Sequence, residues 1–300
     1  MLLDIKNAKL AQLIPEDGFL EPISVGYGIT EGIIWNFKTQ RLIFSDMSLG
    51  KVYEWNPQTK KTKVIKTPSN ISNGNFIDRE GRVVSCEHAT SSIVRMEHDG
   101  RYLKVLASHY EGKALNSPND IIIDSQDRIW FTDPIYGRKS EKVGITRASE
   151  LGFQGVYRLD PDGSLHLASK DFDQPNGLCM EIGEKTLLVN DTPRKHIRRF
   201  QVAEDGSLSG GEVIAEIAGE GPGSPDGLKI DREGNIYCTG PGGIYLFEPS
   251  GAPLGRINTP EHVRNFCFGG EDWSTLYLAG STTIYRLSTN TRGVDYFPSV

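Results

Sequence analysis

The sequence has few cysteines, no long apolar run and almost no helical periodicity. Because no stretch of 18 apolar residues occurs among its 300 residues, it contains no candidate membrane-spanning helix. Its cysteines form no C-x-x-C pair, which argues against a structural zinc site. We expect them to be buried free thiols, since each falls in or next to a predicted strand: Cys86, Cys179, Cys238 and Cys267.

Positive charge is not in excess either. The chain has 33 Lys and Arg against 39 Asp and Glu, a net charge of -6. Nucleic acids bind clusters of Lys and Arg, so we expect no nucleic-acid partner. We expect no membrane partner either, because the apolar run that would span a membrane is missing. No charged leader with an apolar core is present at the start, and together with reduced thiols this predicts a cytoplasmic protein. A monomer and a homodimer both remain open.

Two common catalytic motifs are missing as well. The sequence contains no G-x-S-x-G nucleophile elbow and no P-loop. The glycine-rich stretch at 219–223 lacks a following Lys and leads into a predicted strand, so we interpret it as a loop. Metal-assisted hydrolysis is the chemistry that remains.

What the sequence does contain is a sixfold repeat. In each unit a polar residue precedes two short strands, and these polar residues are 39 to 57 positions apart. Strand repeats of 40 to 50 residues are typical of β-propellers. The six polar residues are Glu31, Asn75, Asn119, Asn176, Asp226 and Asn265.

The repeat predicts an all-β fold, a six-bladed β-propeller with four-stranded antiparallel blades around a central channel. The second strands of the units are short, rich in β-branched and aromatic residues, and bounded by turn residues. We expect a single domain over residues 1–300, with an N-terminal arm at 1–25. An insertion at 134–152 interrupts the third unit, and insertions in propellers map to one face. It is either a partial lid over the channel or a solvated loop.

First strands lie innermost in a blade, so their polar residues should meet at the channel. Glu31 and Asp226 provide carboxylates, and Asn119 and Asn176 provide amide oxygens. An all-oxygen set suits a hard divalent cation, with Ca²⁺ first and Mg²⁺, Mn²⁺ or Zn²⁺ as alternatives. These residues could instead cap turns, but Glu31 is a poor turn former.

A second set of polar residues is expected near the same face. Glu87, His88 and Asp133 end second strands, and with Asn75 and Asn119 they are candidates for substrate contact. Solvated strand ends are the alternative. His88 could carry a proton, touch the substrate, or be a hydrogen-bonded structural residue.

At these residues the chain resembles the SMP-30/gluconolactonase/luciferin-regenerating-enzyme family, with its bacterial gluconolactonases as the closest match. The resemblance implies a six-bladed propeller and a metal held by a Glu, an Asn and an Asp, which match Glu31, Asn176 and Asp226, with a further Asn matching Asn119. Some members carry an Arg two residues before that Asn, where this chain has Ser117. The motifs that carry the resemblance are Thr30–Trp35, Asn73–Asn75, Cys86–His88, Asn116–Asp120, Trp130–Pro134, Pro175–Gly177, Pro225–Gly227 and Asn265–Gly269.

We therefore expect a metal-dependent lactonase that hydrolyses a sugar-derived lactone. A metal would stabilise charge on the lactone carbonyl oxygen while a carboxylate deprotonates water. Asp226 is the first candidate base, Glu31 the second and Asp120 the third. Two other functions stay open: a non-catalytic propeller that binds a ligand or protein around a structural metal, and a phosphotriesterase-type hydrolase.

Overall fold

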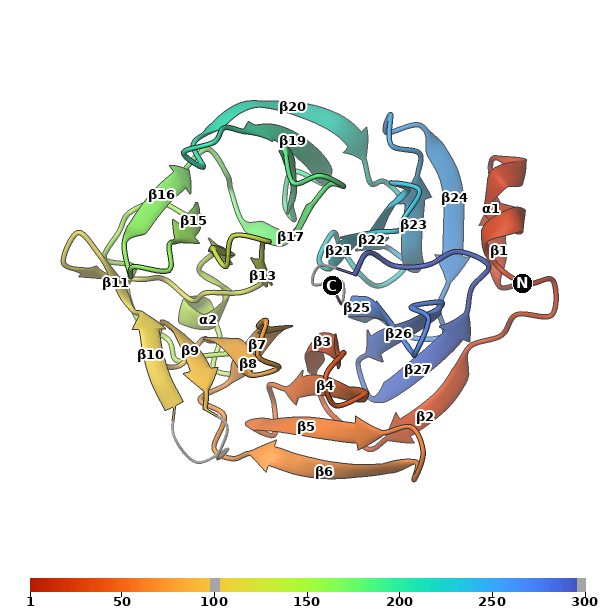
Figure 1. The fold of residues 1–300 in the computed structure, drawn as a ribbon, viewed down its shortest axis with the longest axis horizontal. Coiled ribbons are helices and arrows are strands. Elements are labelled where there is room, and N and C mark those ends of the chain that lie inside the picture. The colour runs from red at the N-terminus through yellow and green to blue at the C-terminus, as the bar shows by residue number, and fades with distance from the viewer. Residues whose placement is uncertain (98–102, 296–300) are drawn as a thin grey trace.

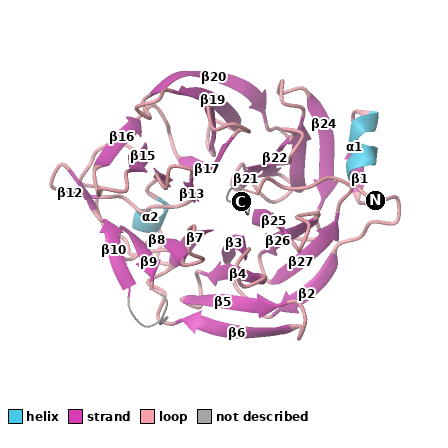
Figure 2. Cartoon of the chain, viewed as in Figure 1, coloured by secondary structure: helices cyan, strands magenta, loops and turns pink. Residues whose placement is uncertain are grey.

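The computed structural model describes residues 1–97 and 103–295, whose strands form six antiparallel sheets in a ring around a central axis (Figure 1). The predicted all-β, six-bladed propeller is thus confirmed. Among the described residues helices are limited to α1 (Ala8–Leu13) and α2 (Tyr136–Lys139), as Figure 2 shows.

Five blades are built from consecutive strands, innermost strand first. The first three blades contain β3 (Thr30–Asn36), β4 (Arg41–Asp46), β5 (Lys51–Asn56) and β6 (Lys61–Lys66); β7 (Ser72–Ile77), β8 (Val83–Glu87), β9 (Ser92–Met96) and β10 (Leu103–Ala107); and β13 (Ile121–Ile123), β14 (Ile129–Asp133), β15 (Gly155–Leu159) and β16 (Leu165–Ser169). The fourth and fifth contain β17 (Pro175–Met180), β18 (Thr186–Asp191), β19 (His196–Val202) and β20 (Leu208–Glu216); and β21 (Leu228–Ile230), β22 (Ile236–Gly240), β23 (Gly243–Phe247) and β24 (Pro253–Asn258). A small hairpin, β11 (His109–Tyr110) and β12 (Lys113–Ala114), connects blades two and three.

The sixth blade joins the two ends of the chain. It consists of β25 (Val263–Gly269), β26 (Thr275–Gly280) and β27 (Thr283–Ser288), and its outer strand is the N-terminal β2 (Glu21–Val25). In Figure 1 the red β2 lies beside the blue β27. Glu21 and Arg286 form an ion pair across this junction at 2.7 Å. The strand β1 (Leu3–Ile5) adds a fifth strand outside β24.

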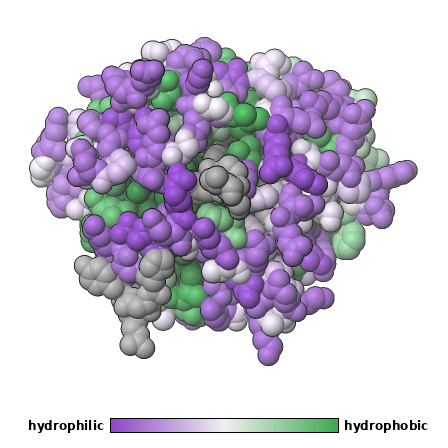
Figure 3. All heavy atoms as spheres, viewed as in Figure 1, coloured by the Kyte–Doolittle hydropathy of each residue, from purple (hydrophilic) through white to green (hydrophobic). Residues whose placement is uncertain are grey.

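The core lies between neighbouring blades, where sheets pack face to face. Trp35 of β3 stacks on Tyr277 of β26, with ring centroids 5.4 Å apart. Phe131 stacks on Tyr157 within the third blade in the same manner, at 5.3 Å. Burial of such aromatic side chains dominates the energetics of a core. On the face seen in Figure 3 hydrophilic residues predominate, with hydrophobic residues visible in patches between them.

All four cysteines are buried and free, as expected. No helix in the described part of the chain is long and apolar enough to cross a membrane.

The segment 134–152 is held to the propeller by a buried arginine. Arg138, in α2, is only 4% exposed, and its Nε donates to the Asn116 carbonyl at 2.7 Å. The same guanidinium donates to the carbonyls of Leu115 and Ala148, so it connects the insertion to the chain that leads into blade three.

Candidate active site

A polar pocket lies at the N-terminal ends of the inner strands. Its volume of about 160 Å³ is below the roughly 300–1,000 Å³ that is usual for pockets that hold drug-sized ligands. The pocket is lined by Ile29, Glu31, Met47, Asn73, His88, Asn119, Tyr136, Val143, Asn176, Thr192, Ser224, Asp226 and Arg264.

Each blade contributes to this lining one residue from the start of its inner strand or from the segment just before it. In the first blade Thr30 pairs with Asp46 at the end of the second strand, and Glu31 follows Thr30. In the fourth blade Pro175 pairs with Asp191, and Asn176 follows Pro175. The complete ring is Glu31, Asn73, Asn119, Asn176, Asp226 and Arg264.

The predicted ring is therefore corrected at two places. In the second blade Ser72 pairs with Glu87, so the equivalent residue is Asn73 and not Asn75. In the sixth blade Val263 pairs with Gly280, so the equivalent residue is Arg264 and not Asn265. Register shifts follow the ring position in blades one, two, four and six alike, so they do not explain the two errors. Asn75 and Asn265 lie further along their inner strands than the ring residues, and their side chains bond to blade one, at the Gly32 carbonyl and at Glu31.

Glu31 is nearly inaccessible, with 3% of its surface exposed. Its Oε2 accepts from the Gly32 amide at 2.8 Å and from Asn265 Nδ2 at 3.3 Å, while Oε1 has no hydrogen bond to a described residue. Burial raises the pKa of Glu31 to about 7, and the nearby charge of Asp120 acts in the same direction. The carboxylate is thus held in place on one side and free on the other.

Asp226 precedes β21, is half-buried and lines the pocket. Neither carboxylate oxygen has a hydrogen bond to a described residue. Burial, followed by the charge of Glu31, holds the pKa of Asp226 well above its usual range, although Arg264 and Lys229 oppose this. A buried carboxylate whose pKa is raised by burial and by a second carboxylate favours a nearby cation.

The amide of Asn176 is oriented by Thr192. Its Nδ2 donates to Thr192 Oγ1 at 3.2 Å, and that hydroxyl donates to the Pro225 carbonyl at 2.6 Å. Asn176 Oδ1 is buried without a hydrogen-bond partner among the described residues. A buried unpaired carbonyl oxygen costs free energy unless a ligand meets it, so this atom indicates a binding site.

The residues present fit a hard divalent cation. Asn119, 5% exposed, has no side-chain hydrogen bond to a described residue, so two amide oxygens and two carboxylates are available together. Hard cations take oxygen ligands of this kind. Within residues 1–97 and 103–295 no group of three or more His, Cys, Asp or Glu could hold a metal, so a site in this part of the chain depends on amide ligands.

His88 lines the pocket, but both of its ring nitrogens have partners. Nδ1 lies 2.6 Å from the Val143 carbonyl and therefore carries the proton, while Nε2 lies 3.2 Å from Asn73 Nδ2. Burial lowers the pKa of His88 to about 4, and Arg147 adds to this. Gly137 packs so closely on the imidazole that a Cβ would lie 2.7 Å from His88 Cβ. His88 thus connects blade two to the segment 134–152, which contributes Tyr136 and Val143 to the lining of the pocket.

Asn75 and Glu87, two of the predicted substrate-binding residues, are not placed in the lining. Asn75 donates to the Gly32 carbonyl at 2.8 Å and accepts from Ser85 Oγ at 2.6 Å, which connects the first two blades. Glu87 is 1% exposed and forms an ion pair with Lys66 at 2.6 Å. The polar atoms of both side chains bond to other residues of the protein, so we do not assign them to substrate binding.

Two predicted aspartates also lie outside the lining. Asp133 is fully buried, its Oδ2 accepts from the Asn116 amide at 2.8 Å, and burial raises its pKa to about 7. Asp120 points to Lys229, with Oδ2 and Nζ 3.6 Å apart, and Lys229 Nζ also lies 3.4 Å from Asn265 Oδ1. Asn265 also donates to Glu31. A chain of polar contacts therefore runs from Asp120 through Lys229 and Asn265 to Glu31 in the pocket.

Sequence reasoning missed Arg264 and did not assign Tyr136 to the site. Arg264 is the one charged residue that comes directly before any of the six predicted polar residues, which is a signal that could have identified it. Tyr136 reaches the pocket from α2, and its hydroxyl is buried without a hydrogen bond that meets ordinary geometry. Burial raises the pKa of Tyr136, so its hydroxyl is a neutral donor.

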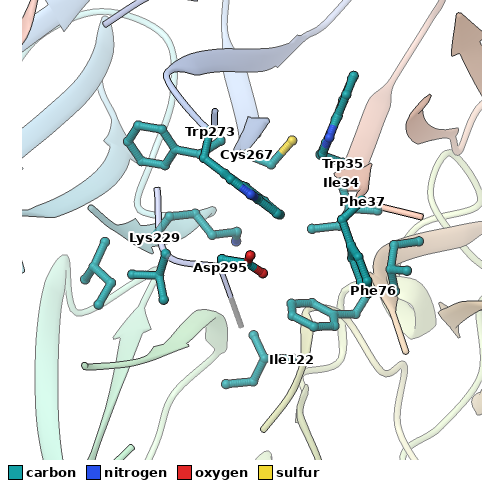
Figure 4. A pocket seen from close by; sticks show the side chains of 13 residues that line it. Ile34, Trp35, Phe37, Phe76, Ile122, Lys229, Cys267, Trp273 and Asp295 are labelled. Carbon is teal, nitrogen blue, oxygen red and sulfur yellow. The ribbon is translucent and has the colours of Figure 1, made fainter. Parts of the chain in front are cut away.

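A second, apolar cavity of about 40 Å³ lies further along the same inner strands (Figure 4). Phe76, Ile122 and Trp273 border it, and the ends of Lys229 and Asp295 approach one another inside it, as Figure 4 shows. Its mostly apolar lining offers few groups for chemistry, so the polar pocket is the better candidate for an active site.

A six-bladed propeller with one polar side chain from each inner strand around a small axial pocket defines the class of protein. The chain belongs to the family described as the SMP-30/Gluconolactonase/LRE-like region, whose model matches residues 29–282. It is 30% identical over 295 residues to a gluconolactonase from Zymomonas mobilis, covering 91% of this chain and 82% of that protein. The structure of a gluconolactonase from Xanthomonas campestris has a TM-score of 0.89 and 32% identity, covering 96% and 95% of the two chains. Regucalcin from Agrobacterium tumefaciens, a calcium-binding protein, shares the fold with a TM-score of 0.76 and 16% identity, over 92% and 96% of the chains.

Proposed function

We propose that this protein is a metal-dependent lactonase that hydrolyses a small sugar-derived lactone to its hydroxy acid. The observation that carries the proposal is that four oxygen-donor side chains present unpaired oxygens to one pocket of about 160 Å³. Membership of a family that includes gluconolactonases supports the same reaction class.

The residues that would hold the metal are Glu31, Asn119, Asn176 and Asp226. Their donor set favours Ca²⁺, with Mg²⁺, Mn²⁺ and Zn²⁺ as alternatives. A calcium-binding protein of the same fold agrees with this order. When bound, a divalent cation polarises the lactone carbonyl oxygen and compensates the charge that develops on it.

The residues of the chain then have separate tasks. Asp226 is our first candidate for general base, because both of its oxygens are free to take a proton from an attacking water. Glu31 is the second candidate through Oε1. Asp120 is disfavoured, because it lies outside the lining and faces Lys229. Tyr136 and Asn119 line the pocket, and we expect them to donate hydrogen bonds to substrate oxygens.

The test is hydrolysis of glucono-1,5-lactone by chelator-treated protein, before and after addition of each divalent cation, with spontaneous hydrolysis subtracted. We expect Ca²⁺ to restore activity. We expect Glu31→Gln to weaken metal binding in calorimetry, and Asp226→Asn to lower turnover by about 100-fold or more at saturating metal. Glu54→Gln is the matched control, since Glu54 pairs with Lys63 on the outer part of blade one at 2.8 Å.

Full turnover by Asp226→Asn with metal bound would remove Asp226 as the base. Metal binding without activity on any lactone would instead favour a non-catalytic binding propeller. Activity confined to phosphotriesters would favour a phosphotriesterase-type hydrolase.

A further inference from the structure

The sixth position of the pocket ring holds a cation where the other blades place carboxylates or amides. Arg264 follows Val263 in β25, and blade six lies between the blades that provide Asp226 and Glu31. Its backbone is fixed, because its carbonyl accepts from the Gly227 amide at 2.8 Å and from Thr239 Oγ1 at 3.4 Å. Of the described residues that line the pocket, Arg264 is the one Lys or Arg.

The guanidinium of Arg264 is largely unpaired. Its one side-chain hydrogen bond to a described residue runs from Nη1 to Ser281 Oγ, at 3.0 Å. No nitrogen of Arg264 lies within 4.0 Å of a carboxylate oxygen in the described chain, although Arg264 is close enough to lower the pKa of both Glu31 and Asp226. Since a guanidinium has five N–H donors and is always charged, most of its donors remain for a ligand.

The net charge of the pocket also favours an anionic ligand at Arg264. A divalent cation bound as proposed above would be neutralised by Glu31 and Asp226, and Arg264 would then leave the pocket with an uncompensated positive charge. An Arg in this setting favours the planar oxygens of a carboxylate or a phosphate, which it can bind through two parallel hydrogen bonds.

The surroundings indicate which side of the pocket would receive such a group. Ser281, which accepts from Arg264, is in the turn between β26 and β27, and Ser224 precedes Asp226 on the neighbouring blade. Ile29 and Met47 border the pocket on blade one, and they offer no donors to an anion. The region around Arg264 is therefore the part of the lining suited to an anionic substituent.

We infer that Arg264 is a specificity-determining residue, and that the preferred substrate is a sugar-acid lactone carrying a second anionic group, a carboxylate or a phosphate, away from the lactone carbonyl. This inference rests on the lactonase function proposed above. The anionic group would bind Arg264 while the lactone carbonyl lies at the metal ligands.

The experiment compares two lactones of the same ring size that differ at one carbon. D-Glucono-1,4-lactone has a neutral hydroxymethyl group where D-glucaro-1,4-lactone has a carboxylate. For the wild-type protein with saturating metal, we expect kcat/KM to be at least about tenfold higher for the glucarolactone. 6-Phosphogluconolactone, compared with glucono-1,5-lactone, distinguishes a phosphate preference from a carboxylate preference.

The variants separate binding of the anion from a structural role. Arg264→Gln should lower kcat/KM for the anionic lactone by about 10- to 100-fold more than for the neutral lactone, so the ratio of the two values is the quantity that tests the inference. Arg264→Lys should keep part of the preference, because it keeps the charge. Arg286→Gln is the matched control, since Arg286 is also in blade six but pairs with Glu21 outside the pocket. Circular dichroism and thermal melting check that each variant is folded.

The outcomes are distinct. A wild-type protein that hydrolyses the neutral lactones as well as both anionic ones overturns the inference and leaves the lactonase function intact. An equal loss on both kinds of lactone in a folded Arg264→Gln also overturns it, because this would indicate a general electrostatic effect. Failure to hydrolyse any lactone with any of the cations refutes the proposed function, and the inference with it.

Discussion

Thr192 determines which atom of Asn176 faces the pocket. The Thr192 hydroxyl uses its proton on the Pro225 carbonyl at 2.6 Å, so it can only accept from Asn176, whose Nδ2 lies 3.2 Å away. The amide therefore presents its oxygen, and not its nitrogen, to the neighbouring carboxylates.

Replacing Thr192 by Val should weaken metal binding about 10- to 100-fold, because the amide is then free to rotate. Isothermal titration calorimetry with Ca²⁺ measures the effect. Thr186→Val, in the same strand β18, removes a hydroxyl that bonds Glu181 far from the pocket and should leave the affinity unchanged. Unchanged affinity in Thr192→Val would show that Thr192 does not orient a metal ligand.

The stability of the protein should decrease as the pH falls from 6.5 to 4, in part because of His88. The pKa of His88 is lowered from 6.5 to about 4 in the fold, so the unfolded chain binds the additional proton in this window and unfolding is favoured. The groups that face the ring are the Asn73 amide, the Val143 carbonyl and Arg147, and none of them is an anion. The contribution is at most about 3 kcal/mol.

Urea unfolding of the wild type and of His88→Gln at several pH values tests this. The wild type should lose more stability than the variant between pH 6.5 and pH 4. Above pH 7 the two curves of unfolding free energy against pH should run parallel. Parallel curves over the whole range would mean that His88 titrates normally.

Gly177→Ala should destabilise the protein strongly and disturb the site. A Cβ at this position would lie 2.0 Å from the carbonyl oxygen of Asp226, so the inner strands of blades four and five would have to separate. We expect a loss of about 3 kcal/mol or more, and weaker metal binding. Gly112→Ala is the comparison: Gly112 has a φ of 77° but open space around it, so only about 1 kcal/mol of backbone strain is expected. Equal melting temperatures for the two variants would contradict this prediction.

Removal of one partner from the buried Lys66–Glu87 pair should cost more than removal of the charge from both. Their side chains are 6% and 2% exposed and 2.6 Å apart. Lys66→Met leaves a buried carboxylate uncompensated, for an expected loss of about 3–5 kcal/mol. The double variant Lys66→Met/Glu87→Gln should recover most of it, because the introduced glutamine side chain is neutral and can still accept from Asn70 Nδ2. A double-mutant cycle on unfolding free energies measures the coupling, and additive losses would rule out a strong interaction.

The fold could be predicted from the sequence because a propeller repeats its inner strand at regular intervals. Of the six polar residues that this repeat identified, four line the pocket: Glu31, Asn119, Asn176 and Asp226. These four stand directly after a residue that pairs with, or lies opposite, the end of the second strand, so the spacing along the sequence and the position in space agree.

The same reasoning failed at Asn75 and Asn265, because both are polar residues of an inner strand and the sequence does not show that their side chains bond to the neighbouring blade. Asn73 and Arg264, which precede them in the same strands, line the pocket instead. Glu87 and Asp133 could not be separated from solvated or substrate-binding residues by sequence alone. Their partners, Lys66 and the Asn116 amide, are 21 and 17 positions away, and Lys66 belongs to the outer strand of the preceding blade. The pairing of β2 with β27 was also beyond the sequence pattern, since a single isolated strand carries no sign of its partner.

That pairing has a consequence for how the chain is made. A ribosome releases the N-terminal part first, and domains generally begin to fold in that order. Here Glu21 must wait for Arg286, which emerges 265 residues later, before the ring can close. Until then β2 has no partner, and both open edges of the growing ring can pair with other chains. Completion of the pocket, which takes one side chain from every blade, is therefore among the last events of biosynthesis, and a chaperone that shields these edges would increase the yield of active protein.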